Sequence, residues 1–294
     1  MYNFPIGVIV ESFRGTTEER IKKAAGIGAA GIQMYMTAYG LKENHVDNMT
    51  DDRAKYLLDM VKSEGMKFSA ICGDFGGDYK GGSALKDKER NVELIEKQKR
   101  VMDFALKFET NIVTTHIGVV PQDSNSEEYK IQQAACFELA EYADSLGAHF
   151  AIETGPETAA HLGDFLDTLN SRGVAVNFDP ANLVMCVADN DLAAGVHRLK
   201  DYIVHTHAKD GMMLKNVDAA NLYEAGDIVD AIESGRAFIE LPLGQGNVNW
   251  NGYLRALQDI GYKGFLTIER ECGDDPDADI IMAAQFLRDK IASL

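Results

Sequence analysis

Short apolar runs alternate with amphipathic segments along almost the whole chain. The runs predict eight strands, at Ile6–Glu11, Gly31–Tyr35, Phe68–Cys72, Ile112–His116, Phe150–Thr154, Ala175–Phe178, Ile203–Thr206 and Phe265–Glu269. Apolar residues repeat with a helical period between them, as at Asp51–Glu64, Arg90–Phe108, Glu127–Gly147 and Thr158–Ser171, and a last helix is expected from Pro276 to the end. Such alternation is typical of parallel strands joined by crossover helices.

Eight strand–helix units predict an α/β protein of the (β/α)₈ TIM-barrel class. A doubly wound sheet normally has five or six strands and a glycine-rich first turn, whereas the first turn here reads Glu-Ser-Phe-Arg-Gly. Glycines within residues 24–31 and 63–67 are interpreted as helix caps that lead into the next strand. The 294 residues contain no internal repeat, low-complexity stretch or linker, so residues 1–294 are predicted to form a single domain.

One stretch interrupts this rhythm, because residues 211–249 separate the seventh and eighth strands by far more than one helix. A long loop at this position lies on the carboxyl-terminal face of a barrel, where lids and substrate walls are built. We therefore expect the segment to cover a binding pocket, and the alternative is an additional surface helix without function.

Charge and cysteine usage narrow the classes of partner. The net charge of −17 repels phosphate backbones and anionic lipid, so nucleic acids and membranes are not expected as partners. No apolar run approaches the roughly 20 residues that span a bilayer, and the first residues carry no signal-peptide pattern. The four cysteines form no CxxC pair, which favours a reducing cytoplasm. A homo-oligomer remains compatible with the sequence.

Four successive strands each have, at or directly after the carboxyl-terminal end, a residue that could bind a metal ion. Glu153 lies at the end of the fifth strand, Asp179 and His207 directly follow the sixth and the seventh, and Glu269 ends the eighth. The intervals between the first three are close to one barrel unit of about 31 residues, and the long loop extends the last. Three carboxylates and one imidazole form an oxygen-rich site that favours Mn²⁺, with Mg²⁺, Co²⁺ or Zn²⁺ as alternatives. The competing interpretation is that each carboxylate is solvated or caps the next helix.

Other strand-end residues are weaker candidates for the pocket. His205 shares the face of His207 but lies one layer deeper, so we expect it to be packed behind the ligands. His116 ends the fourth strand and Glu11 the first, and both could contact substrate, although His116 could equally be a satisfied core histidine. No phosphate-binding loop is present, and Arg14, Arg236 and Arg270 are isolated, so phosphate on the substrate stays open.

These motifs resemble the xylose-isomerase-like barrel superfamily, which holds ketose 3-epimerases, sugar-phosphate epimerases, inosose dehydratases and isomerases, and the DNA-repair endonuclease four. The matching segments are Glu153-Thr-Gly, Asn-Phe-Asp179-Pro-Ala-Asn182, His205-Thr-His207-Ala-Lys-Asp210, Gly-Gln-Gly-Asn247 and Thr-Ile-Glu269-Arg. The resemblance implies that Glu153, Asp179, His207 and Glu269 bind one divalent metal. It also implies that Glu153 and Glu269 transfer protons on opposite sides of a sugar carbon.

Departures from the family pattern refine the expected substrate. Asn182 stands where the ketose 3-epimerases and endonuclease four have histidine, and the Asp-x-His pair of that endonuclease is absent around Gly244–Trp250. A three-zinc cluster is therefore incomplete, and DNA cleavage is not expected. An asparagine at 182 can still hydrogen-bond a sugar hydroxyl. We expect His116, Asn182, Lys209 and Glu11 to contact a small sugar or sugar phosphate.

The leading functional hypothesis is a metal-dependent sugar isomerase or epimerase that works through an enediolate. One glutamate removes the proton beside the carbonyl, and its return to the opposite face or to the neighbouring carbon gives epimerisation or isomerisation. The alternative is a dehydratase or keto-sugar lyase of the inosose-dehydratase kind on the same metal site, with His116 or Lys209 as the acid. A third hypothesis is a sugar-binding barrel without catalysis, which would not need two opposed carboxylates.

Overall fold

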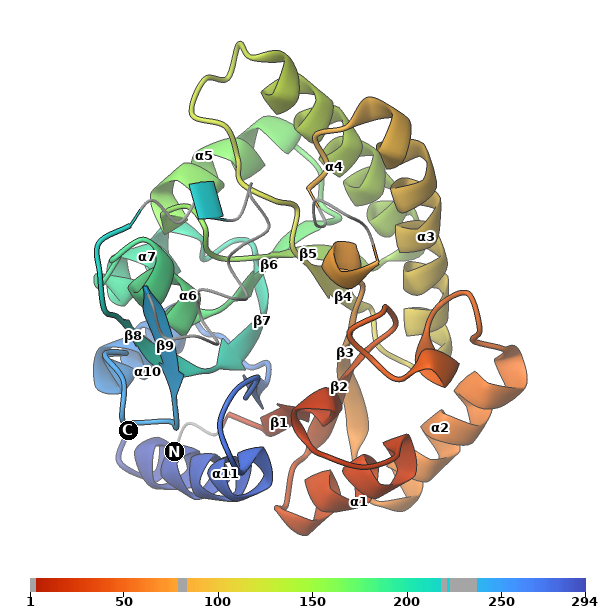
Figure 1. The fold of residues 1–294 in the computed structure, drawn as a ribbon, viewed down its shortest axis with the longest axis vertical. Helices are drawn as coiled ribbons and strands as arrows, with labels where there is room; N and C mark the ends of the chain where they lie inside the picture. The colour runs from red at the N-terminus through yellow and green to blue at the C-terminus, as the bar shows by residue number, and fades with distance from the viewer. Residues whose placement is uncertain (1–3, 79–83, 218–220, 223–236) are drawn as a thin grey trace.

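The computed structural model describes residues 4–78, 84–217, 221–222 and 237–294. Eight parallel strands close into a barrel in the order β1-β10-β7-β6-β5-β4-β3-β2, with helices around the outside (Figure 1). The barrel strands are β1 (Ile6–Ile9), β2 (Gly31–Tyr35), β3 (Lys67–Cys72), β4 (Ile112–Thr115), β5 (His149–Glu153), β6 (Val174–Phe178), β7 (Ile203–Ala208) and β10 (Leu266–Ile268). The predicted (β/α)₈ TIM barrel is confirmed.

The helices cover the outer face of the barrel, and most begin at a residue that caps them. They are α1 (Thr17–Gly26), α2 (Asp51–Ser63), α3 (Lys88–Lys107), α4 (Glu127–Leu146), α5 (Ala159–Leu169), α6 (Pro180–Cys186), α7 (Leu192–Arg198), α10 (Trp250–Asp259) and α11 (Pro276–Ala292). Thr16 and Glu19 form a capping box at the start of α1. Gly28 and Gly65 follow α1 and α2 with φ of +70° and +76°, which confirms the predicted glycine caps.

The predicted boundaries differ from the observed ones by a few residues at the strand ends. The first strand stops at Ile9 and not at Glu11, because the chain turns into a short 3₁₀ helix, η1 (Val10–Ser12). The fourth strand ends at Thr115, one residue before His116. The seventh strand runs on to Ala208, so that His207 lies inside the barrel wall. These differences matter because each falls beside a candidate site residue.

The interior of the barrel contains a hydrogen-bonded group of polar side chains around His205. His205 on β7 approaches Asn177 on β6 at 2.9 Å, Thr267 on β10 at 2.9 Å and Ser69 on β3 at 3.3 Å. All four residues are buried, and burial lowers the pKa of His205 well below its ordinary value, so the ring is neutral. These side chains lie one layer below His207, towards the amino-terminal ends of the strands.

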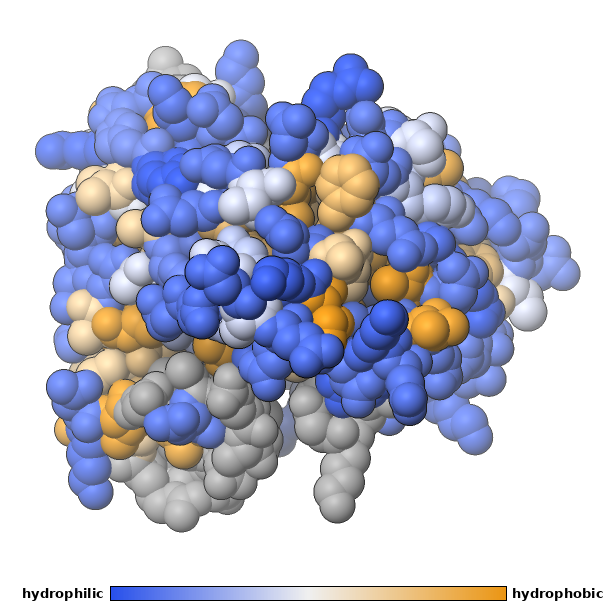
Figure 2. All heavy atoms as spheres, turned by 90° about the horizontal axis from the view of Figure 1, so that it is seen from above, coloured by the Kyte–Doolittle hydropathy of each residue, from blue (hydrophilic) through white to orange (hydrophobic). Residues whose placement is uncertain are grey.

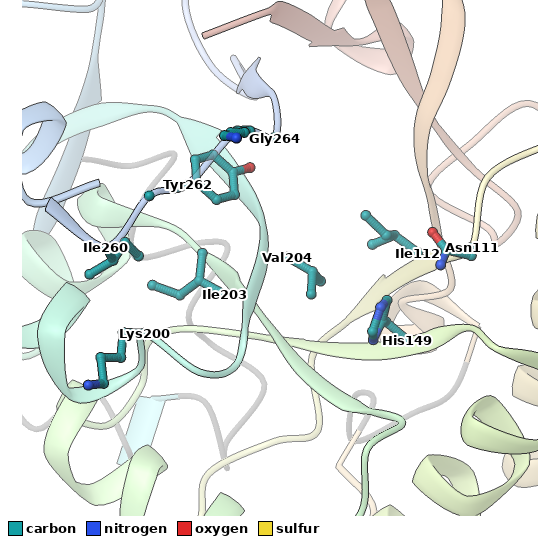
Figure 3. Close-up of a pocket in the computed structure, with 11 residues that line it drawn as sticks. Asn111, Ile112, His149, Lys200, Ile203, Val204, Ile260, Tyr262 and Gly264 are labelled. Atoms are coloured by element: carbon teal, nitrogen blue, oxygen red, sulfur yellow. The ribbon is translucent and has the colours of Figure 1, made fainter. Parts of the chain in front are cut away.

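The surface shown in Figure 2 is mostly hydrophilic, with small and separate hydrophobic patches. A hollow of about 340 Å³ lies between the amino-terminal ends of β4, β5 and β7, where Asn111, His149 and Lys200 line it (Figure 3). That end of a barrel is opposite the face that carries catalytic residues. Within the described part of the chain, no helix has the length and apolar character needed to cross a membrane.

Candidate metal centre

Four strand-end residues meet at the carboxyl-terminal end of the barrel. Glu153 is the last residue of β5, Asp179 and Glu269 directly follow β6 and β10, and His207 lies near the end of β7. One ligand atom of each residue lies within 4.8 Å of those of the others, and all four residues are buried. We call Glu153, Asp179, His207 and Glu269 the four-residue cluster. The cluster could bind a metal ion.

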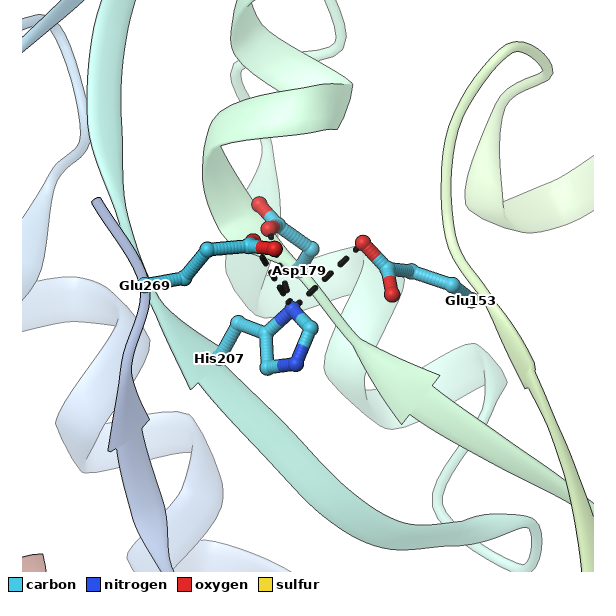
Figure 4. A group of neighbouring side chains, drawn as sticks. All are labelled: Glu153, Asp179, His207 and Glu269. Carbon is cyan, nitrogen blue, oxygen red and sulfur yellow. Dashed lines mark ion pairs between the residues drawn. The ribbon is translucent and has the colours of Figure 1, made fainter. Parts of the chain in front are cut away.

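Nδ1 of His207 is the centre of this arrangement. It lies 3.0 Å from Glu269 Oε2, 3.4 Å from Glu153 Oε1 and 3.5 Å from Asp179 Oδ2. Figure 4 shows Glu269 and Glu153 reaching towards the imidazole from opposite sides, with Asp179 between them. The strands bring these atoms together because neighbouring parallel strands end at the same edge of the barrel.

The two oxygens of Asp179 have different surroundings. Oδ1 caps α6, accepting the backbone N–H groups of Ala181 at 2.7 Å and Asn182 at 2.9 Å. Oδ2 is buried, faces the cluster and has no hydrogen-bond donor among the described residues. A buried carboxylate oxygen without a donor is costly, and a bound cation would satisfy it. The donor set therefore fits a divalent metal ion, and helix capping and metal binding are compatible roles for this residue.

The three buried carboxylates and the cationic groups beside them shift one another's pKa values. Burial opposes the charged form of His207, but Glu269 and Glu153 outweigh it and raise the pKa of His207 well above its ordinary value. Burial raises the pKa of Glu269 to about 7, although His207 and Lys209 act in the opposite direction. For Glu153 burial is outweighed by His207 and His116, so its pKa is lowered. A divalent cation would favour the ionised form of all three carboxylates.

Three amide side chains contact members of the four-residue cluster by hydrogen bonds. Asn177 Nδ2 donates to Glu153 Oε2 at 2.9 Å, and Asn182 Nδ2 donates to Glu153 Oε1 at 3.0 Å. Gln33 Oε1 lies 3.1 Å from Nε2 of His207, on the side of the ring away from the carboxylates. Neither Asn177 nor Gln33 is among the site residues predicted from the sequence. The available signal was an amide residue inside an otherwise apolar strand, which must find hydrogen-bond partners when buried.

His205 lies one layer below His207, as predicted. Its Nδ1 faces Asn177 Oδ1, and Asn177 in turn bonds Glu153. Its hydrogen bonding to the four-residue cluster is therefore indirect, through the amide of Asn177. The two histidines lie on the same face of β7 at different depths, with ring centroids 5.7 Å apart.

His116 directly follows β4, and its ring bridges two carboxylates. Nδ1 lies 2.9 Å from Asp74 Oδ2, and Nε2 lies 3.6 Å from Glu153 Oε1. Burial opposes the charged ring, but Glu153 and Asp74 outweigh it and raise the pKa of His116 to about 10. The structure thus brings His116 to the edge of the four-residue cluster. Its contact with a sugar stays a prediction.

Lys209, which directly follows β7, also borders the cluster. Its Nζ lies 3.2 Å from Glu269 Oε2 and 2.8 Å from Glu271 Oε2, and the side chain is buried. Asn182 uses its amide N–H groups on Glu153 and on the carbonyl of Thr154. Substrate contact stays a prediction for both Lys209 and Asn182.

Glu11 lies in a different environment from the one expected of a strand-end ligand. The chain leaves β1 before this residue, and Oε2 accepts the backbone N–H of Tyr35 at 3.1 Å. Oε1 is buried with no hydrogen-bond partner among the described residues, and burial raises the pKa of Glu11 to about 7. The carboxyl group belongs to the contact between η1 and β2, and its contact with substrate stays a prediction.

Asp210 organises the start of the long segment after β7. Its two oxygens accept four N–H groups, from the backbones of Gly211, Gly244 and Val248 and from the indole of Trp250, at 2.8–3.1 Å. We call these five residues the Asp210 clamp. The clamp joins the two ends of segment 211–249 by hydrogen bonds. Asp210 therefore stabilises this segment and is not a member of the four-residue cluster.

The described part of segment 211–249 lies beside the cluster. β8 (Asp210–Met213) and β9 (Phe238–Leu241) pair as an antiparallel hairpin. Glu240 on β9 is buried and accepts from Arg270 Nη1 at 2.6 Å and from the backbone N–H of Glu271 at 3.0 Å. Since Arg270 follows Glu269, the hairpin is anchored at the rim. Covering of the pocket stays a prediction, and so does the alternative of a surface helix, because residues 218–220 and 223–236 lie outside the described ones.

The isolated arginines have protein partners where the structure describes them. Arg270 pairs with Glu240 and with Asp279 at 2.9 Å, and Arg14 donates to the carbonyl of Asp274 at 2.8 Å. Arg236 lies outside the described residues. These contacts favour ion-pair and structural roles for Arg14 and Arg270 over phosphate binding.

The sequence matches one family model and two curated relatives. The family model described as xylose isomerase-like TIM barrel matches residues 21–290. Uncharacterized protein MJ1311 of Methanocaldococcus jannaschii is 20% identical over 199 residues, 64% of this chain and 60% of that protein. Uncharacterized protein YfiH of Bacillus subtilis is 27% identical over 139 residues, 47% of this chain and 42% of that protein. The matched regions span less than two thirds of the length of either relative.

Solved structures share the fold over nearly the whole chain. A xylose isomerase domain protein from Planctomyces limnophilus is 25% identical, with a TM-score of 0.79, and the match covers 100% of this chain and 99% of that one. D-psicose 3-epimerase from Clostridium cellulolyticum H10, solved with D-tagatose, is 14% identical with a TM-score of 0.72 and coverage of 98% and 99%. A probable 3-DHS dehydratase, AsbF, from Bacillus anthracis is 16% identical with a TM-score of 0.72 and coverage of 97% and 99%.

Proposed function

The chain belongs to the xylose isomerase-like TIM barrel family, and from this membership we propose that it is a divalent-metal-dependent sugar isomerase or epimerase. The cation is Mn²⁺, with Mg²⁺, Co²⁺ and Zn²⁺ as alternatives, and the substrate is a small sugar or sugar phosphate. Epimerases of D-psicose among the solved structures support this substrate class. A cytoplasmic location and a homo-oligomeric state remain predictions.

The observation that carries the proposal is the opposition of two carboxylates. Glu153 and Glu269 approach Nδ1 of His207 from opposite sides, at 3.4 and 3.0 Å, and both are buried (Figure 4). Epimerisation needs one group to remove a proton from carbon and another to return it on the opposite face. A site that only binds sugar has no need of two buried carboxylates placed in this way.

The four-residue cluster would hold the cation, which supplies Lewis-acid polarisation of the carbonyl and orientation of the neighbouring hydroxyl. Glu153 and Glu269 move the proton at the carbon beside that carbonyl, one as base and one as acid. Asn177 and Asn182 hold the two oxygens of Glu153 by hydrogen bonds at 2.9 and 3.0 Å, which orients its carboxylate. Return of the proton to the same carbon gives an epimer, and return to the neighbouring carbon gives an isomer.

A dehydratase or lyase on the same site is the second candidate. The observation that favours it is the pair formed by His116 and Asp74, 2.9 Å apart, beside Glu153. A protonated His116 could donate to a leaving hydroxyl or glycosyl oxygen after the first proton is removed. The fold similarity to a probable 3-DHS dehydratase is compatible with this outcome.

Exchange of substrate hydrogen with solvent tests the proposal directly. The purified protein is incubated with Mn²⁺ and a panel of ketoses and inososes in D₂O. An epimerase or isomerase incorporates deuterium at the reacting carbon, a lyase accumulates the eliminated product, and a binding protein does neither. The absence of both deuterium incorporation and eliminated product, with substrate bound, would refute the proposal that the protein is an enzyme.

Two variants assign the carboxylates. Glu153→Gln and Glu269→Gln keep an oxygen and the side-chain size but remove the base, so each should lose turnover by about 10²–10⁴-fold. In two-base epimerisation, one variant can still exchange deuterium into one epimer without inverting it. The exposed Glu141→Gln serves as a matched control and should behave as the wild type. Near-normal turnover of both site variants with metal bound would rule out the two-carboxylate mechanism and direct attention to His116.

A further inference from the structure

A buried glutamine on the far side of the barrel contacts the imidazole of the proposed metal ligand. Gln33 lies in β2, is fully buried and reaches across the barrel to β7. Its Oε1 is 3.1 Å from His207 Nε2, and its Nε2 is 3.1 Å from Thr114 Oγ1 on β4. The contact therefore involves the ring nitrogen that does not face the carboxylates.

The contact with Gln33 determines which nitrogen of the His207 imidazole carries a proton in the neutral ring. A neutral imidazole carries one N–H and one lone pair, and the hydrogen bond of one nitrogen decides which of them faces the other partner. Because a carbonyl oxygen only accepts, Gln33 Oε1 keeps a proton on Nε2, so in the neutral ring the lone pair is on Nδ1. Nδ1 faces Glu153, Asp179 and Glu269.

We propose that Gln33 is a positioning residue that accepts the Nε2–H of His207 and thereby presents Nδ1 to a divalent cation. The inference rests on the proposed function, since it concerns the same metal site. It adds a residue from β2 to a site whose ligands all come from β5, β6, β7 and β10. Outer hydrogen bonds to ligand histidines orient the ring and raise its basicity.

The hydrogen bonds around Gln33 favour the amide orientation that this role requires. Thr114 is fully buried, and its hydroxyl oxygen accepts from Gln33 Nε2 at 3.1 Å. A flipped amide would instead turn its NH₂ group towards His207 and move the ring proton to Nδ1. The bond to Thr114 on β4 thus orients the Gln33 amide, and the orientation of that amide decides which nitrogen of His207 on β7 keeps a proton.

Asn177, the other amide beside His207, does not offer an acceptor to Nε2. Its Nδ2 lies 3.2 Å from His207 Nε2, but an NH₂ group only donates, and it donates to Glu153 Oε2 at 2.9 Å. Its Oδ1 faces His205 Nδ1 at 2.9 Å, and Thr267 Oγ1 lies 2.9 Å from His205 Nε2. Because the oxygen of Asn177 is taken by His205, Gln33 supplies the acceptor for His207 Nε2 within the described residues.

Three buried substitutions separate the hydrogen bond from simple packing. Gln33→Met removes the acceptor and keeps the length of the side chain. Gln33→Glu keeps an acceptor and adds a negative charge. Gln132→Met makes the same exchange at a fully buried glutamine on α4 whose amide bonds the carbonyl of Ile117. Calorimetric titration with Mn²⁺ should show affinity about 10–100-fold weaker for Gln33→Met, wild-type or tighter for Gln33→Glu, and unchanged for Gln132→Met.

A spectroscopic readout reports the hydrogen bond itself. In protein labelled with ¹⁵N-histidine and loaded with diamagnetic Zn²⁺, the Nε2–H proton of His207 should be shifted downfield and slow to exchange. Gln33→Met should lose both properties, whereas Gln33→Glu should retain them. A residue that only fills space would leave this resonance unchanged. Circular dichroism confirms that each variant is folded.

The outcomes distinguish this inference from the proposed function. Wild-type protein that binds no divalent cation would refute the metal site and the role of Gln33 together. Wild-type binding with unchanged affinity in Gln33→Met would refute the role of Gln33 alone. Weaker binding by Gln33→Glu than by Gln33→Met would also refute it, because a buried charge or a packing defect would then explain the loss.

Discussion

Replacement of Asp210 by asparagine should destabilise the protein strongly, although the change is nearly isosteric. The side chain is buried and accepts four N–H groups in the Asp210 clamp. One oxygen accepts from Gly211 and Val248, and the other accepts from Gly244 and the indole of Trp250. Asparagine supplies only one oxygen, so its NH₂ group must face two N–H donors.

The magnitude follows from the two hydrogen bonds that are lost. A hydrogen bond to a charged group contributes about 1.5–3 kcal/mol, so two lost bonds correspond to roughly 3–6 kcal/mol in the free energy of unfolding. Typical domains have about 5–15 kcal/mol in total, so this is a large fraction. Asp191→Asn is a matched control, because this exposed residue caps α7 through one bond to Ala194 N and asparagine caps equally well.

Urea denaturation measures the difference, followed by far-ultraviolet circular dichroism and by tryptophan fluorescence. Trp250 is the single tryptophan of the chain and is itself a donor in the clamp, so its emission reports the site directly. Asp210→Asn should lower the free energy of unfolding by several kcal/mol, and Asp191→Asn should leave it nearly unchanged. A loss below about 1 kcal/mol for Asp210→Asn, with unaltered Trp250 emission, would refute the assignment of four accepted hydrogen bonds.

Three further predictions concern the metal, the long segment and pH. Asp179→Ala and His207→Ala should lose bound divalent metal in elemental analysis while circular dichroism shows a folded barrel, and full occupancy in both would contradict the ligand assignment. Saturation with a true substrate should protect backbone N–H groups of residues 237–249 from hydrogen exchange, and unchanged exchange would count against a lid. Burial raises the pKa of Glu11 from 4.5 to about 7, so folded wild-type protein loses stability as pH rises through that interval. Glu11→Gln should therefore match the wild type below pH 4.5 and exceed it above pH 7 by up to about 3 kcal/mol in urea denaturation, and a gain that does not depend on pH would exclude this cause.

Hydrophobic pattern and strand-end chemistry were sufficient to predict the barrel and to select the four residues that meet at its rim. Eight apolar runs separated by helical segments leave a closed parallel barrel as the natural arrangement. Parallel strands of a barrel all present their carboxyl ends on one face, so Glu153, Asp179, His207 and Glu269 could be placed together without knowledge of any distance. The order of strands in the chain carries this information.

Only the tertiary structure decided which atoms do what within that site. The separate tasks of the two Asp179 oxygens depend on how α6 leaves β6, which no residue pattern describes. Gln33 is far from His207 in the sequence, and the two side chains meet only because the barrel closes across its interior. Glu11 lies in η1 and not at the predicted strand end, because β1 ends two residues earlier than its apolar pattern predicts. Local propensity determines elements, whereas contacts between side chains on distant strands depend on the radius and register of the closed barrel, which are properties of all eight strands together.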